Sequence, residues 1–267
     1  MSEIYKHPRE YDLEHLGDDE DIRFYVSLLK QLKPRRVLEL GCGTGRVTIP
    51  LAHEAAGLGC EVIGLDAAPA MLDRARESLA DASLEVRQCV HFVAGDMRCF
   101  IAEAKLDLIL IPCASLSHVL ELDEQIAVFQ RCHANLNPGG RFVVEVNMPN
   151  LAAYADSFRV PPRTALEIDL DRIDESDDTR LIRRKTTRYL SDHQLAEIRF
   201  LYEKYRDGVG SESRIDDFQS HVFFPRELEL LFIHAGFQIE RKIGDYRGRE
   251  LAPNSPIVIM IGKRADG

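Results

Sequence analysis

Short apolar runs alternate with periodic amphipathic segments over the first 150 residues. The apolar runs predict five strands: RVLEL (36–40), CEVIGLD (60–66), VHFVAGD (90–96), LDLILIP (106–112) and RFVVEVN (141–147). Apolar residues recurring every three or four positions predict helices at 21–34, 46–57, 68–80 and 123–136. Strands that are apolar throughout are typical of a parallel sheet covered by helices on both faces. The pattern therefore predicts an α/β, doubly wound sheet with right-handed connections.

The pattern changes after Asn150, where charged and apolar residues begin to alternate. From about Thr164 to Phe224, three segments predict antiparallel strands, namely RLIRRKTTRYL, QLAEIRFLYEKY and SRIDDFQSHVFF. A helix, PRELELLFIHAGF, and two closing strands, FQIERKIG and SPIVIMIGK, follow. We expect residues 1–150 and 225–267 to form one domain, and 151–224 to form an inserted antiparallel β subdomain.

Composition and charge narrow the class of protein. The formal net charge of -10 argues against a nucleic-acid partner, and the basic segment RLIRRKTTR is more simply explained by solvated strand positions. The six cysteines form no CxxC pair and lie in or beside apolar runs, which predicts buried, reduced thiols and no metal site. The chain has no signal-peptide pattern and no run approaching 18 apolar residues, so we expect a cytoplasmic protein without a membrane span.

A glycine-rich loop, GCGTG (41–45), stands between the first strand and the next helix. Its backbone N–H groups can bind a carboxylate at the start of that helix. A dinucleotide fingerprint reads G-x-G-x-x-G, but Arg46 stands where its third glycine would be. That departure disfavours a nicotinamide-dependent oxidoreductase, while a tight turn without a ligand stays possible.

Three acids accompany this loop. Asp66 ends the second strand, where a carboxylate can bind both hydroxyls of a ribose, whether in NAD or in an adenosyl sulfonium. Glu39, beneath the loop, suits a ligand that carries an ammonium and a sulfonium and suits a pyrophosphate poorly. Asp96 ends the third strand and could accept a bond from an adenine amino group, with Met97 beside the ring. Asp66 and Asp96 could instead act only as helix caps, and Glu39 could bind loop amides.

The ordered set of segments, roughly residues 37–147, resembles the class I S-adenosylmethionine-dependent methyltransferases, with a weaker resemblance to amino-sugar N-methyltransferases. The resemblance implies a Rossmann-like, mostly parallel, seven-stranded sheet in which SPIVIMIGK is the antiparallel last strand. It implies S-adenosylmethionine as donor, S-adenosylhomocysteine as product, and a small-molecule acceptor methylated at N or O. The implied cofactor-binding residues are Tyr11 (as part of a lid), Glu39, Gly41, Gly43, Gly45, Asp66, Ala67, Met71, Asp96, Met97 and Pro112; Met71 could equally be a core residue.

His118 is the candidate catalytic residue, in the loop PCASLSHVLEL after the fourth strand. Amino-sugar methyltransferases resemble the chain here, and an imidazole with a usual pKa near ~6.5 suits a proton acceptor at neutral pH. His118 could therefore orient or deprotonate the methyl acceptor, or serve only in packing. The inserted strands could roof the acceptor pocket or form a dimer interface, so both a monomer and a homodimer are expected possibilities. A non-catalytic regulator that binds an adenosyl cofactor is the alternative outside enzymes.

Overall fold

The computed structural model describes residues 3–159 and 165–265. Contacts between Cα atoms divide the chain into two compact units. The larger unit comprises Gly17–Met148 and Phe223–Gly267, and the smaller comprises Met1–Leu16 and Pro149–Val222. Residues 1–16 thus group with the inserted segment, whereas the sequence analysis had placed them in the first domain.

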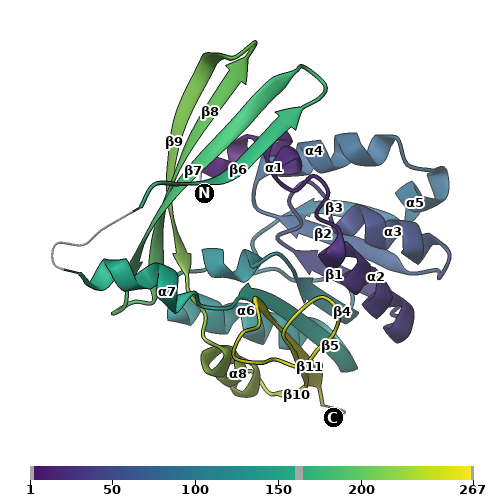
Figure 1. The fold of residues 1–267 in the computed structure, drawn as a ribbon. Coiled ribbons are helices and arrows are strands. Elements are labelled where there is room, and N and C mark those ends of the chain that lie inside the picture. Colours follow the sequence, from purple (N-terminus) through teal and green to yellow (C-terminus); the bar gives the residue numbers. More distant parts are fainter. Residues whose placement is uncertain (1–2, 160–164, 266–267) are drawn as a thin grey trace. The chain divides into compact units, whose positions relative to one another are not determined.

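A seven-stranded sheet forms the centre of the larger unit, in the order β10-β11-β5-β4-β1-β2-β3 (Figure 1). Its strands are β1 (Arg36–Leu40), β2 (Glu61–Asp66), β3 (Val90–Ala94), β4 (Leu106–Ile111), β5 (Leu136–Asn147), β10 (Phe237–Ile243) and β11 (Ile257–Arg264). β1 to β5 pair in parallel, and β11 is antiparallel to both β5 and β10. The predicted Rossmann-like sheet with an antiparallel last strand is confirmed.

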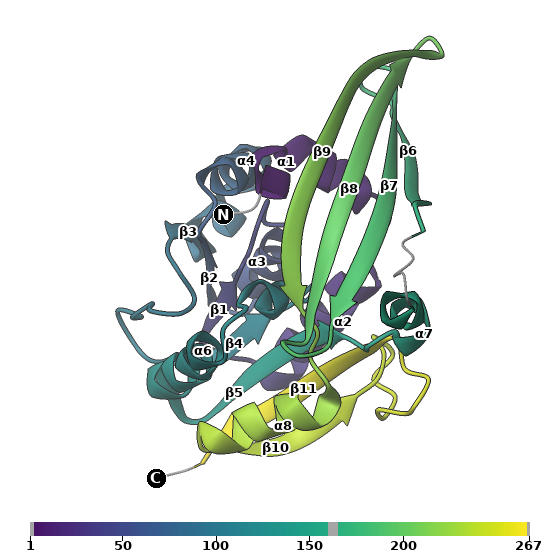
Figure 2. The same ribbon diagram turned by 90° about the vertical axis from the view of Figure 1, so that its left-hand side faces the viewer.

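Helices pack on both faces of this sheet, as the apolar strands predict. The helices of the unit are α2 (Glu20–Leu32), α3 (Thr48–Ala56), α4 (Pro69–Ala80), α5 (Leu84–Cys89), η2 (Ser115–His118), α6 (Leu122–Asn135) and α8 (Pro225–His234). Leu38 and Leu40 of β1 join the core that includes α6 and α8, whereas Val37 joins the core that includes α2 and α3. Figure 2 shows α8 lying along β10, and α6 packs beside α8.

The chain reverses its direction of sheet growth between β1 and β4. After β1 it adds β2 and β3 on one side, and then returns to add β4 on the other side of β1. Loops that leave the carboxyl ends of two such strands diverge and open a crevice, which is where open α/β sheets bind ligands. The glycine loop follows β1 and the Pro112–His118 segment follows β4, so both lie at this point.

The smaller unit contains a four-stranded antiparallel sheet in the order β6-β7-β8-β9. Its elements are η1 (Glu3–Lys6), α1 (Pro8–Glu14), α7 (Leu151–Tyr154), η3 (Ala155–Phe158), β6 (Glu167–Asp174), β7 (Thr179–Leu190), β8 (Leu195–Arg206) and β9 (Val209–His221). The three predicted strands are present, and β6 is an additional edge strand. The predicted start of this region at Thr164 lies outside the described residues.

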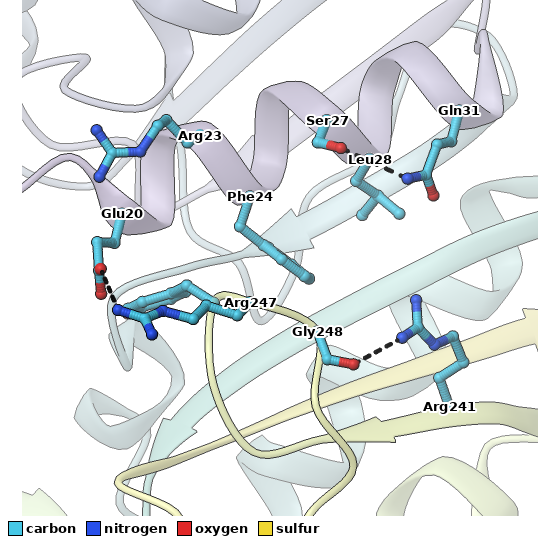
Figure 3. A pocket seen from close by; sticks show the side chains of 10 residues that line it. Glu20, Arg23, Phe24, Ser27, Leu28, Gln31, Arg241, Arg247 and Gly248 are labelled. Carbon is cyan, nitrogen blue, oxygen red and sulfur yellow. Dashed lines mark hydrogen bonds and ion pairs between the residues drawn. The ribbon is translucent and has the colours of Figure 1, made fainter.

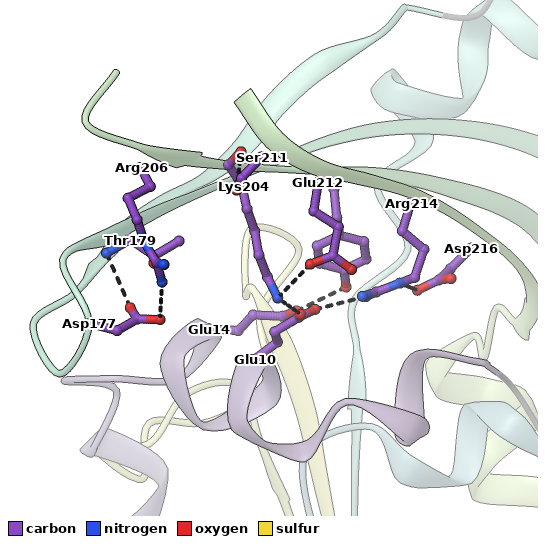
Figure 4. Close-up of polar contacts among 11 residues, drawn as sticks. Glu10, Glu14, Asp177, Thr179, Lys204, Arg206, Ser211, Glu212, Arg214 and Asp216 are labelled. Atoms are coloured by element: carbon purple, nitrogen blue, oxygen red, sulfur yellow. Dashed lines mark hydrogen bonds and ion pairs between the residues drawn. The ribbon is translucent and has the colours of Figure 1, made fainter. Parts of the chain in front are cut away.

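Helix α1 is held on this sheet by two carboxylates (Figure 4). Glu10 pairs with Lys204 at 2.7 Å and with Arg214 at 2.8 Å, while Glu14 pairs with Arg183 at 2.5 Å and accepts the hydroxyl of Tyr202 at 2.9 Å. The arginines of the basic segment in β7 are paired in the same manner with acids: Arg180 with Asp171, Arg183 with Asp169, Arg184 with Glu203, and Arg188 with Glu197. These positions are charged because they form cross-strand ion pairs.

The cysteines agree only in part with the prediction that all are buried. Cys42, Cys60 and Cys132 are buried and unpaired as predicted, but Cys99 is exposed, because it lies in the loop after β3 and not in a strand or helix. Among the described residues, no helix is both long and apolar enough to cross a membrane.

Candidate functional site

Left-handed glycines shape the loop between β1 and α3. Gly41, Gly43 and Gly45 have φ values of +74°, +56° and +80°, a region that residues with a Cβ rarely adopt. A Cβ added to Gly41 would lie 2.9 Å from the Cβ of Ser115 and 3.5 Å from the terminal methyl of Met97. The loop therefore passes directly against the turn after β4 and the segment after β3. The carboxyl ends of three strands converge here.

The close approach at Gly41 predicts a specific loss on substitution. Gly41→Ala should lower the free energy of unfolding by more than the roughly 1–2 kcal/mol of left-handed strain alone, because the new methyl must displace Ser115. Gly59→Ala is the matched control, since Gly59 has φ +65° and no neighbour within 4 Å of an added Cβ. Urea unfolding of both variants measures the difference, and equal losses would show that Gly41 is not constrained by its neighbours.

Asp66 links the glycine loop to the start of α4. Its Oδ2 accepts the backbone N–H of Gly43 at 2.7 Å, and its Oδ1 accepts that of Ala68 at 2.8 Å. Burial raises the pKa of this carboxyl, while the N–H groups of Ala68, Gly43 and Ala67 oppose the rise. A carboxylate has about four lone-pair positions, so it retains the capacity to accept ribose hydroxyls. Asp66 thus fixes the segment that leads into α4 and also holds the loop, but it is not the N-cap of that helix, which is Ala68.

Glu39 lies beneath the loop and is only 2% exposed. Its Oε2 accepts the hydroxyl of Thr48 at 2.5 Å, in the first turn of α3. Desolvation raises the pKa of Glu39 from 4.5 to about 8, and the Thr48 hydrogen bond and the charge of Arg46 only partly offset this. With a pKa of about 8 the carboxyl is mostly protonated at pH 7. A cation placed beside it would lower that pKa and favour the ionised form.

Arg46, which follows the glycine loop, connects it to α2 by a largely buried ion pair and to the turn after β4 by a contact with Cys113. Arg46 donates from Nη1 to Oδ1 of Asp21 at 3.1 Å, and its Nη2 contacts the second carboxylate oxygen. The same Nη2 lies 2.9 Å from the Sγ of Cys113. The sequence analysis missed Asp21 and Cys113, because a single acid in α2 and a single thiol after a strand carry no motif. Of these three residues, the sequence analysis singled out Arg46 alone, because it departs from the dinucleotide fingerprint.

Comparison with known proteins identifies the family. A family model described as a methyltransferase domain matches residues 37–140. The structure is similar to the CcbJ methyltransferase from Streptomyces caelestis, with a TM-score of 0.72, 25% sequence identity, and coverage of 94% of this chain and 98% of that one. The matched segment and the fold are those of class I S-adenosylmethionine-dependent methyltransferases.

Two further comparisons describe how far the similarity of this methyltransferase extends. The putative methyltransferase YqeM of Bacillus subtilis (strain 168) is 25% identical over 222 residues, which cover 82% of this chain and 80% of YqeM. Several other curated relatives are matched over less than half of their length. CalS10 from Micromonospora echinaspora, an amino pentose methyltransferase solved with S-adenosylmethionine, shares the fold with a TM-score of 0.69, 19% identity and coverage of 96% of each chain.

The methyltransferase keeps its third candidate acid on the surface. Asp96 lies two residues beyond the end of β3 and is bound by Arg98, whose Nε and Nη2 donate to its carboxylate at 2.9 and 2.5 Å. These hydrogen bonds lower the pKa of Asp96. An adenine amino group would therefore share this carboxylate with Arg98. Met97 points toward Gly41, where it could cover the ring.

His118 ends the short helix η2 of the methyltransferase, and its side chain is exposed. Although solvent reaches the imidazole, desolvation by the surrounding protein lowers its pKa from 6.5 to about 4. The ring is therefore neutral at pH 7. A base with so low a pKa removes protons weakly, which favours a role in orienting an acceptor over a role in deprotonating it.

The other predicted residues occupy three different settings. Pro112 directly follows β4 and is buried, and its carbonyl accepts the hydroxyl of Ser115 at 2.9 Å. Ala67 is exposed beside Asp66, whereas Met71 of α4 is only 1% exposed, which fits the core alternative. Tyr11 belongs to α1 in the smaller unit, with its ring centroid 4.5 Å from that of His15. Its place in a lid stays a prediction.

A cavity of about 470 Å³ in the methyltransferase lies elsewhere, between α2 and the 241–248 segment (Figure 3). Its lining residues are Glu20, Arg23, Phe24, Ser27, Leu28, Gln31, Arg241, Tyr246, Arg247 and Gly248. None of these is a predicted site residue, and the charged groups are occupied: Arg23 with Asp19, Arg247 with Glu20, and Arg241 with the carbonyl of Gly248. Within the described residues, no group of three or more His, Cys, Asp or Glu side chains is placed to hold a metal ion.

Proposed function

We propose that the protein transfers the methyl group of S-adenosylmethionine to a nitrogen or oxygen atom of a small-molecule acceptor. The observation that carries this proposal is the convergence of the glycine loop, Asp66 and the turn after β4 at the crevice between β1 and β4. When bound, the donor supplies a methyl group already activated by a positively charged sulfur.

The residues present fit such a donor. The N–H groups of Gly41, Cys42, Gly43 and Gly45 already donate within the protein, so a methionine carboxylate would use the remaining N–H groups at the start of α3. Asp66 would accept ribose hydroxyls, and Glu39 would lie beneath the cationic part. Asp96 and Met97 would contact the adenine, together with Ala67. A nicotinamide cofactor is disfavoured because Arg46 stands at the position of the third glycine of the dinucleotide fingerprint, and its side chain is bound to Asp21.

The acceptor side rests on His118 and on the family. The solved relatives include an amino pentose methyltransferase with the same fold, which makes amino sugars the first acceptors to test. The neutral ring of His118 would accept a hydrogen bond from the N–H or O–H group to be methylated. This contact would point the lone pair of that nitrogen or oxygen toward the methyl group of the donor. Holding two reactants at about 3 Å in line can supply several kcal/mol of rate enhancement. Residues 151–224, with Tyr11, would contribute to the acceptor pocket or to a dimer interface.

Transfer of labelled methyl groups tests the proposal. Incubation with methyl-labelled S-adenosylmethionine and a panel of amino sugars and hydroxylated small molecules should label at least one acceptor in a time-dependent manner. Failure to label any acceptor while the donor binds tightly would favour the alternative, a non-catalytic protein that binds an adenosyl cofactor.

His118→Ala should lower turnover at least about tenfold and leave donor affinity nearly unchanged, because a positioning contact acts on the acceptor alone. Since the pKa of His118 is about 4, the rate of the unsubstituted enzyme should show no loss from its protonation between pH 8 and 6. His53→Ala, at an exposed position of α3, is the control. Equal losses of turnover and donor affinity in His118→Ala would contradict this role.

A further inference from the structure

The turn after β4 has a backbone that its own sequence does not favour. Cys113 and Ala114 both have φ +55°, and two consecutive non-glycine residues in the left-handed region must be held there by their surroundings. The next residue, Ser115, is the one that meets Gly41 of the glycine loop. Any relaxation of the turn would therefore move the wall of the donor crevice.

The side chain of Cys113 is fixed from the glycine-loop side. Its Sγ lies 2.9 Å from Nη2 of Arg46 and 3.5 Å from Oδ2 of Asp21. These contacts orient the thiol. The backbone of the turn is closed by Ser115, whose N–H and hydroxyl donate to the carbonyl of Pro112 at 3.1 and 2.9 Å. A further group acts on the N–H of Cys113.

Glu145 of β5 supplies that group. Its side chain is 3% exposed, and its carboxylate accepts the hydroxyls of Tyr25 and Tyr246, each at 2.7 Å. The backbone N–H of Cys113 also lies close enough to this carboxylate to lower its pKa, against the rise that burial causes. Tyr25 comes from α2 and Tyr246 from the loop between β10 and β11. A buried carboxyl is costly unless several donors satisfy it, and here the donors come from three separate segments.

We propose that Glu145 is a positioning residue, which with Tyr25 and Tyr246 holds the left-handed backbone at Cys113–Ala114 and thereby the wall of the donor site beside Gly41. The inference rests on the proposed function, because it assigns the turn to donor binding. The competing explanation is that Glu145 only ties α2 and the Tyr246 loop into the core. In that case the effect of replacing Glu145 on donor binding would not depend on the strain in the turn.

Relief of that strain separates the two explanations. Glycine adopts the left-handed conformation without a Cβ penalty, so Ala114→Gly should lessen the need for Glu145. The experiment measures the affinity for S-adenosylmethionine by titration calorimetry in the unsubstituted protein, Glu145→Gln, Ala114→Gly and the double variant. Glu240→Gln is the control, because it removes a carboxylate that pairs with Arg141 at the surface.

Glu145→Gln should weaken donor binding about tenfold, as expected if the competent turn falls to about a tenth of the population, and Ala114→Gly should restore at least half of that loss on a logarithmic scale. Unchanged affinity in Glu145→Gln, or a loss that Ala114→Gly does not restore, would overturn the inference. If Glu145→Gln does not fold, Tyr246→Phe replaces it in the same comparison, with the same two outcomes. Absence of donor binding in the unsubstituted protein would instead refute the proposed function.

Discussion

Asp66→Ala should weaken the binding of S-adenosylmethionine by about 100-fold or more. Hydrogen bonds to a charged group contribute about 1.5–3 kcal/mol each, and the variant would lose two of them to the ribose. It would also release the N–H groups of Gly43 and Ala68, which the carboxylate now holds at 2.7 and 2.8 Å. The loop would then lose one of the hydrogen bonds that fix its shape beside the donor site. Titration calorimetry with S-adenosylmethionine measures the effect directly.

The control for Asp66 is another aspartate close in sequence. Asp73 of α4 is exposed and pairs with Arg76 on its own helix, so Asp73→Ala should bind the donor like the unsubstituted protein. The donor affinity of Asp66→Asn should lie between those of Asp66→Ala and the unsubstituted protein, since one side-chain oxygen can still accept a hydrogen bond while the charge is lost. Donor affinity in Asp66→Ala within about threefold of the unsubstituted protein, roughly 0.6 kcal/mol, would contradict the assignment of Asp66 to the ribose.

Glu39→Gln should make the ligand-free protein more stable relative to the unsubstituted protein as the pH rises. The pKa of Glu39 is about 8 in the folded protein and 4.5 in the reference state, so between these values the folded state binds more protons than the unfolded state. Its stability contribution therefore falls with rising pH across this window, by up to about 1.4 kcal/mol per pH unit. Glutamine stays neutral and avoids this loss.

Denaturant unfolding at pH 5, 6, 7 and 8 measures this difference. The two proteins should approach equal stability near pH 4.5 and diverge above it. A difference that does not change with pH would mean that Glu39 is ionised in the folded protein throughout the window, contrary to its burial.

The same group should reveal the charge of the ligand. A cationic donor placed above Glu39 lowers its pKa, so binding near pH 7 should release a proton and affinity should rise with pH. Calorimetry in two buffers with different ionisation enthalpies detects that proton. Glu39→Gln should bind the donor more weakly and release none. Proton release that persists unchanged in the variant would assign the titrating group to another residue.

Local patterns were sufficient to predict the strands of the large sheet and the glycine loop. The runs RVLEL and LDLILIP are mostly apolar because both faces of β1 and β4 are covered, and most of their residues are buried. Strand β6 was missed because EIDLDRID lies at a sheet edge and is mostly exposed, so its pattern carries little apolar signal. The fifth strand was predicted at 141–147, whereas β5 begins at Leu136 because that residue pairs with Leu106.

The site was predictable only where one segment contributes a motif. Gly41 and Asp66 follow strands at recognisable positions, whereas the contact between Gly41 and Ser115 joins residues 74 positions apart in the chain. The role of Glu145 is still harder to predict from the sequence, because its partners Tyr25 and Tyr246 are separated from it by 120 and 101 residues. Such contacts are created by the strand order of the sheet, and periodicity along the chain does not encode that order.

Thermal unfolding with three ligands tests the central claim most directly, namely that the loops at the β1–β4 crevice bind an adenosyl donor. S-adenosylmethionine and S-adenosylhomocysteine, each at about 100 times its dissociation constant, should raise the melting temperature by roughly 5 °C. NADH at the same concentration should leave it unchanged. Stabilisation by NADH alone, with no response to either adenosyl compound, would contradict the account.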